Sequence, residues 1–122
     1  MKQRNVIKQK SFDFAKRVIR LYKYLAETKK EYVVSKQLLR SGTSVGALVR
    51  EAQNAESSLD FFHKLGIAQK ECDESLYWLE LLHETAYLAE KEFTGIYYEA
   101  TELLRMIRSA IITMKSKKQK HP

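Results

Sequence analysis

The chain has 122 residues, of which 44% are hydrophobic and 30% charged, and this predicts one soluble helical domain over residues 1–122. One proline, Pro122, and four glycines are too few for the turns of a β-rich fold, and no apolar run approaches the roughly 20 residues of a membrane span. A single cysteine excludes an intrachain disulfide. The first residues lack the apolar segment of a secretory signal, so we expect a cytoplasmic protein.

The formal net charge of +7 is spread unevenly. Residues 1–30 hold ten Lys and Arg against two acids, residues 31–104 hold six against thirteen, and residues 105–122 hold six bases and no acid. Clustered positive charge attracts nucleic-acid phosphates or acidic protein surfaces. The alternative is that the lysines only keep a helical surface solvated. The candidate nucleic-acid-binding residues are Lys16, Arg17, Arg20, Lys23, Arg105, Arg108, Lys115, Lys117 and Lys118.

The first predicted helix covers residues 11–28, with Asp13 in its first turn. Its expected apolar stripe consists of Phe12, Ala15, Ile19 and Tyr22, with Val18 and Leu25 beside it. Residues 1–10 are polar, and residues 115–122 are basic and cannot bury apolar surface. We therefore expect both ends of the chain to be flexible.

The second predicted helix covers residues 32–55 and contains a run of small residues around Gly42 and Gly46. Glycine inside a helix costs about 1 kcal/mol relative to alanine, so this run indicates the close approach of another helix. Glu51 lies beside the apolar stripe and is expected to be a partly buried acid that accepts a hydrogen bond from a hydroxyl group of a neighbouring helix. The stripe consists of Val34, Leu38, Ser41, Val45, Leu48, Ala52 and Ala55.

The third predicted helix covers residues 58–89 and follows a serine N-cap, with Asp60 in the first turn. Its buried stripe consists of Phe61, Leu65, Ala68, Cys72, Leu76, Leu79 and Leu82. Large apolar residues also project from its other sides, more than a lone bundle requires. We expect a subunit interface there, made by Phe62, Ile67, Tyr77, Trp78 and Leu81.

The fourth predicted helix covers residues 94–114 and starts at Thr94, a plausible N-cap. Its stripe consists of Ile96, Ala100, Leu103, Ile107, Ala110 and Met114. Four helices with short connections predict an all-α, antiparallel up-down-up-down four-helix bundle.

Two acid–histidine pairs have the spacing that di-iron bundles use, namely Asp60 with His63 and Glu80 with His83. Both pairs lie on one predicted helix, about 20 residues or roughly 30 Å apart, and cannot share a site. Cys72 lies on the apolar stripe and is predicted to be a core residue. We predict no catalytic residue, no metal and no cofactor, and therefore no enzyme.

The residues already described resemble a known family, the four-helix bundle proteins encoded in intervening sequences of bacterial 23S ribosomal RNA genes. Segment 37–45, QLLRSGTSV, is similar to that family's Gln-Leu-x-Arg-(Ser/Ala)-x-x-Ser-Ile/Val, and Glu51 matches the glutamate of its Asn-Ile-x-Glu-Gly. Segment 70–82, KECDESLYWLELL, resembles Lys-Glu-x-x-Glu-(Thr/Ser)-x-Tyr-Trp-Leu. Leu48 and Ala52 depart from the family, which often has asparagine and glycine there.

The resemblance implies a homopentameric ring without enzymatic activity. A related family, the accessory variability proteins of diversity-generating retroelements, forms similar basic pentamers that bind nucleic acid and a reverse transcriptase. We therefore predict a non-catalytic oligomeric bundle that binds the backbone of structured RNA or DNA through basic surfaces. The alternative is a scaffold ring that binds an acidic protein partner, for example as an accessory subunit of a nucleic-acid enzyme, with no direct nucleic-acid role.

Overall fold

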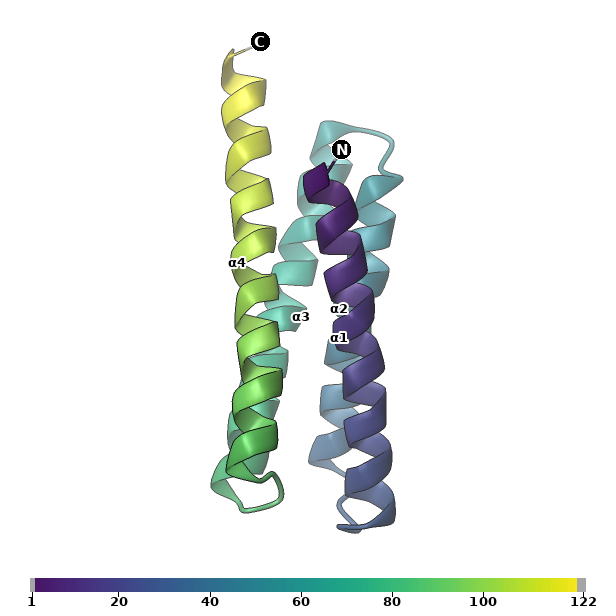
Figure 1. Cartoon of the computed structure of the whole chain (residues 1–122). Helices are drawn as coiled ribbons and strands as arrows, with labels where there is room; N and C mark the ends of the chain where they lie inside the picture. Colours follow the sequence, from purple (N-terminus) through teal and green to yellow (C-terminus); the bar gives the residue numbers. More distant parts are fainter. Residues whose placement is uncertain (1, 121–122) are drawn as a thin grey trace.

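The computed structural model describes the backbone of residues 2–120 and the side chains of residues 4–117. It contains four helices over the described range and no strand: α1 (Lys2–Glu27), α2 (Val34–Gln53), α3 (Ser58–Glu84) and α4 (Glu90–Lys120). Consecutive helices run in opposite directions, and each packs against two neighbours, α1 against α2 and α4, and α3 against α2 and α4 (Figure 1). The all-α four-helix fold agrees with the prediction. Over the same residues, none of the helices is both long and apolar enough to span a membrane.

The stripes predicted for the third and fourth helices form the core. Every predicted stripe residue of α3, from Phe61 to Leu82, is buried, and so are those of α4 from Ile96 to Ala110. Cys72 is buried among them as predicted, and its Sγ donates a hydrogen bond to the carbonyl of Ala100 at 3.3 Å.

The stripe predicted for the first helix was partly wrong: Val18 and Leu25, expected beside it, are buried, but two of its own members are exposed. Phe12 is 47% exposed and Ile19 is also exposed, whereas Phe14 is 1% exposed. The true core stripe recurs at steps of four and three and includes a polar residue, Ser11, whose Oγ donates to the carbonyl of Lys8 at 3.0 Å. The buried apolar members of this stripe are Ile7, Phe14, Val18, Leu21 and Leu25.

Helices α1 and α4 are both longer than predicted. Helix α1 begins at Lys2 and not near residue 11, because Ile7 extends the buried stripe toward the N-terminus. Helix α4 begins at Glu90 and runs to Lys120, and Thr94 is inside it, since its Oγ1 donates to the carbonyl of Glu90 at 2.8 Å. Residues 2–10 and 115–120 are thus helical, and the flexibility expected of the two ends stays a prediction.

The run of small residues in α2 allows α1 to approach closely, as predicted. A Cβ added to Gly42 would lie 2.8 Å from a methyl carbon of Val18, and one added to Gly46 would lie 3.2 Å from the carbonyl oxygen of Ser11. Side chains at these two positions would push α1 away from α2.

Two different caps start α2 and α3. Ser57 caps α3 as predicted, since its Oγ accepts the amide of Asp60 at 3.0 Å. Helix α2 is instead capped by the buried carboxylate of Glu31. This carboxylate accepts hydrogen bonds from the backbone amides of Val33, Val34 and Ser35, at 3.0, 2.9 and 2.7 Å. Burial raises the pKa of Glu31, but these hydrogen bonds outweigh burial and the pKa is lowered.

Candidate nucleic-acid interface

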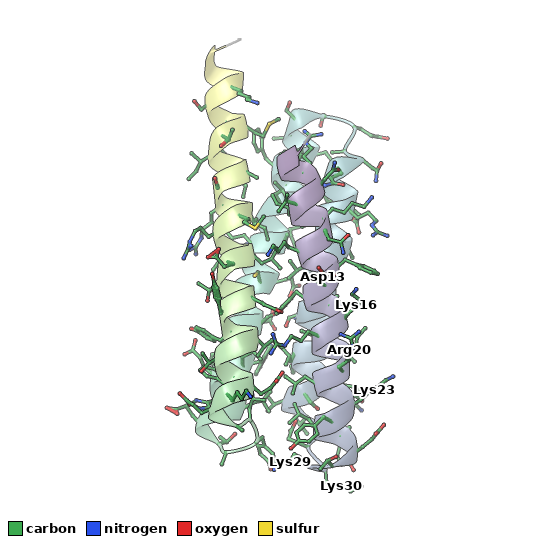
Figure 2. The ribbon with its side chains drawn as sticks, in the orientation of Figure 1. Asp13, Lys16, Arg20, Lys23, Lys29 and Lys30 are labelled. Carbon is green, nitrogen blue, oxygen red and sulfur yellow. The ribbon has the colours of Figure 1, made fainter. Side chains whose placement is uncertain are left out.

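A row of bases runs along the outer side of α1 toward its C-terminal end and continues into the loop before α2 (Figure 2). We call it the basic strip, and it consists of Lys16, Arg20, Lys23, Lys29 and Lys30. The first three recur at steps of four and three, so a helix places them on successive turns of one side. Lys16 pairs with Asp13 at 3.2 Å.

The other four bases of the strip are exposed and make no ion pair with any described residue. Lys30 has φ of 57°, a left-handed conformation that ends α1 and turns the chain toward α2. Lys29 and Lys30 were not among the predicted binding residues, because the loop was considered only as a connection. The exposed acid Glu27 lies within the same segment and offsets part of the charge.

Arg17 was predicted to belong to the interface, but it joins α1 to α4. Its guanidinium contacts Glu99 at 2.9 Å and Glu92 at 3.3 Å, and its side chain is 29% exposed. Both acids lie on α4, which α1 contacts less extensively than it contacts α2. These ion pairs supply polar contacts across that helix pair and leave Arg17 little capacity for phosphate.

The candidate bases of α4 lie apart from the strip. Arg105 pairs within its own helix with Glu102, and Arg108 is exposed without an ion pair to a described residue. Lys115 and Lys117 lie near the end of the bundle that holds the chain termini, whereas the strip runs to the opposite end (Figures 1 and 2). The ammonium of Lys115 lies 5.9 Å from the ring centroid of Phe62. The side chain of Lys118 lies outside the described residues.

Three acids of α3, Glu71, Glu74 and Glu80, already have partners within the chain. Arg40 of α2 contacts Glu71 at 3.1 Å and Glu74 at 2.9 Å. Burial raises the pKa of Glu74, but the hydrogen bond from Arg40 and other contacts outweigh it, so the pKa is lowered. The Tyr97 hydroxyl donates to Glu80 at 2.9 Å.

Two of the five residues predicted to form a subunit interface, Phe62 and Trp78, contact different neighbouring helices, and the interface itself stays a prediction. Tyr77 is 56% exposed, and the other four are half-buried. Phe62 lies under Lys115 on the α4 side, whereas Trp78 donates its Nε1–H to Glu74, the partner of Arg40 on the α2 side. Exposed apolar residues also occur on helices where none was predicted, namely Phe12, Ile19, Tyr98 and Ile112.

The residues considered for catalysis or metal binding have structural partners. Glu51 contacts a neighbouring helix as predicted, since its carboxylate pairs with Lys64 of α3 at 2.9 Å. The predicted burial and the predicted hydroxyl partner were wrong, because the carboxylate is exposed and its partner is a lysine. His83 Nε2 lies 2.6 Å from Glu90, and its ring stacks on Phe93. Burial raises the pKa of the Cys72 thiol to about 12, so it is not a nucleophile at neutral pH. Among the residues described here, no three His, Cys, Asp or Glu are grouped to hold a metal ion.

Comparisons with known proteins agree with this fold. The family model for the 23S rRNA-intervening sequence protein matches residues 3–109. A crystal structure of a protein with unknown function from the S23 ribosomal protein family, from Bacteroides thetaiotaomicron VPI-5482, is 49% identical to this chain. It superposes with a TM-score of 0.88 and covers 89% of this chain and 97% of its own. No curated protein matches the sequence.

Proposed function

We propose that this chain, which belongs to the 23S rRNA-intervening sequence protein family, is a non-catalytic oligomeric bundle that binds nucleic-acid backbone. The main support for this proposal is the basic strip on α1 and in the loop that follows it. The strip consists of Lys16, Arg20, Lys23, Lys29 and Lys30. Four of its bases face solvent without an ion pair to a described residue, although the middle of the chain is acidic. A cytoplasmic location is part of the same proposal.

The dimensions of the strip suit a phosphate backbone. At about 1.5 Å per residue, the helical part of the strip from Lys16 to Glu27 extends roughly 16 Å, and the loop lysines follow it. Duplex DNA carries one phosphate per about 1.7 Å of its axis, so the strip meets several phosphates at once. The strip contains lysines and one arginine, the charged residues that contact phosphate oxygens, and it has no Asn or Gln to read an adenine edge. It therefore supports affinity for the backbone of structured RNA or duplex DNA.

We further propose that copies of the chain associate into a homopentamer, which the resemblance implies and the exposed apolar residues on α1, α3 and α4 support. Five copies of a +7 chain carry a formal charge of +35. Such an assembly presents five strips to one nucleic acid, and the linked contacts raise its avidity. The test is the solution mass, which we expect to be five times the chain mass of 14.3 kDa.

The binding test is a titration of a structured RNA and of a duplex DNA, followed by fluorescence anisotropy across a salt series. The strip variant is Arg20→Glu with Lys23→Glu. We expect wild-type affinity to fall steeply between about 50 and 200 mM salt, because each phosphate contact contributes about −0.9 to the logarithmic slope for duplex DNA. The strip variant removes two contacts, and we expect a slope smaller by about 2 and a lower affinity for both ligands.

The matched control is Lys36→Glu with Lys70→Glu, which makes the same charge change at exposed lysines of α2 and α3 outside the strip. We expect this control to lose less affinity and to keep most of the salt slope. Equal losses in the two variants would show that net charge alone attracts the nucleic acid. A wild-type protein that binds neither ligand at low salt would contradict the proposal and favour the scaffold ring with an acidic protein partner.

A further inference from the structure

An apolar cavity of about 310 Å³ lies at the end of the bundle that holds the chain termini. All four helices contribute to its walls, which include Ile7, Val49, Phe61, Leu65, Ala110 and Met114. Its volume is at the lower end of the range of about 300–1,000 Å³ that small-molecule sites occupy. The cavity exists because alanines stand at two core positions, Ala52 of α2 and Ala110 of α4, where larger residues would fill the space.

The charged residues at this cavity are all cationic. Arg4 of α1 and Lys117 of α4 line it, and no acid does. The guanidinium carbon of Arg4 lies 5.0 Å from the ring centroid of Phe61, so the charge is held beside the apolar wall. Gln53 Nε2 donates to the carbonyl oxygen of Arg4 at 2.6 Å, which ties this first turn of α1 to α2. Arg4 and Lys117 make no ion pair with any described residue.

We propose that this cavity binds a single-chain amphipathic carboxylate, with the hydrocarbon between the helices and the carboxylate at Arg4 and Lys117. The volume of about 310 Å³ is at the small end of ligand sites and suits one unbranched hydrocarbon chain of moderate length, for which a ten-carbon chain serves as the probe. The apolar walls supply the affinity for the chain. The planar fork of Arg4 matches a carboxylate, and the absence of lining acids leaves that charge uncompensated.

This site is separate from the one proposed for nucleic acid. The basic strip runs to the opposite end of α1, and none of its residues lines the cavity. Binding of a fatty carboxylate and binding of nucleic acid therefore succeed or fail independently.

The test is calorimetric titration of the full chain with decanoate and, separately, with decyltrimethylammonium, which has the same chain length and the opposite head charge. We expect one decanoate per chain and at least tenfold weaker binding of decyltrimethylammonium. Arg4→Gln combined with Lys117→Gln is expected to weaken decanoate about tenfold, because both cations are lost while the apolar walls remain. Arg105→Gln combined with Arg108→Gln, at two exposed arginines of α4 outside the cavity, is the matched control and should bind decanoate like the wild type.

Ala110→Leu tests the location, because the larger side chain fills the cavity. We expect at least a tenfold loss of decanoate affinity, with helical content checked by circular dichroism. Chemical shifts of the Ile7 and Met114 methyl groups in the wild type give a second readout, and both are expected to move on adding decanoate. Failure of decanoate to bind, equal binding of the two head groups, or methyl shifts that ignore decanoate would each overturn the proposal. The first result would also follow if a second copy of the chain filled the cavity.

Discussion

At the scale of single residues, Glu31 shows how a side chain that lies before a helix can cap the helix's first turn. Its carboxylate accepts three amides at the beginning of α2, so Glu31→Ala leaves these donors without a protein partner. We expect a loss of about 1–2 kcal/mol in the free energy of unfolding at neutral pH, measured by urea denaturation. Glu27→Ala, an exposed acid one turn earlier, should change it by less than about 0.5 kcal/mol.

Glu31 also makes the free energy of unfolding depend on pH. The pKa of Glu31 is lowered in the folded chain, so its ionised form stabilises the fold above the unfolded pKa of about 4.3, and this stabilisation is lost as pH falls through the folded pKa. We expect the difference between wild type and Glu31→Ala to shrink on going from neutral to strongly acidic pH. A constant difference would mean that the carboxylate charge does not contribute. Local sequence did not predict this cap, because Val33 occupies the N-cap position and the acid lies two residues before it.

Replacing glycine by alanine is expected to change the stability of the fold in opposite directions at Gly42 and Gly66. A Cβ at Gly42 would lie 2.8–3.2 Å from three carbons of Val18, a stiff β-branched residue, whereas a Cβ at Gly66 would meet nothing within 4 Å. Gly66→Ala should gain about 0.5–1 kcal/mol of stability from helix propensity. Gly42→Ala gains the same propensity but overpacks the contact between α1 and α2 by about 1–3 kcal/mol, so a net loss is expected. Urea midpoints of the two variants should move in opposite directions, and a stabilised Gly42→Ala would contradict the close packing.

At the scale of helices, the stripes of α3 and α4 were predictable because each is an unbroken series of apolar residues. The stripe of α1 was not, because Ser11 interrupts the true series and Phe12 and Ile19 offer a competing one on the outside. Ser11 faces Gly46 of α2, where a Cβ would lie 3.2 Å from the Ser11 carbonyl oxygen, and the pattern of one helix does not reveal such a contact between two helices.

This correction predicts a large difference between neighbouring phenylalanines. Phe14→Ala should destabilise the fold by about 3–5 kcal/mol, because a fully buried ring is removed. Phe12→Ala should cost about 1 kcal/mol or less, because Phe12 is 47% exposed and its cation–π contacts, with Lys16 at 5.1 Å and Arg50 at 5.8 Å, are weak at an exposed site. Denaturation at matched protein concentrations measures both losses. Similar losses of stability in the two variants would mean that Phe12 packs in the core as well as Phe14 does, which would favour the stripe predicted from the sequence.

At the scale of the whole molecule, the fold follows from sequence more readily than the candidate site does. Charge counting identified α1 as basic, but Arg17 is engaged by Glu92 and Glu99, which lie 75 and 82 residues away. No local pattern gives such a pairing. Conversely, the loop lysines extend the strip only because α1 ends at Glu27 and they follow at the same end of the bundle (Figure 2).

A polyanion that binds the folded chain must also stabilise it, by mass action. With free ligand at about 100 times its Kd, the stabilisation is about 2.7 kcal/mol. We expect heparin, a sulfated polyanion without bases, to raise the Tm at low salt, because the contacts proposed for the strip depend on charge alone. High salt should abolish the rise, since screening removes the phosphate-like contacts. The Arg20→Glu, Lys23→Glu variant should show a smaller rise than the Lys36→Glu, Lys70→Glu variant, because both carry the same net charge and only the first alters the strip. An equal rise in these two variants would place polyanion binding outside the strip, and an unchanged Tm in the wild type would mean that the folded chain has no such affinity.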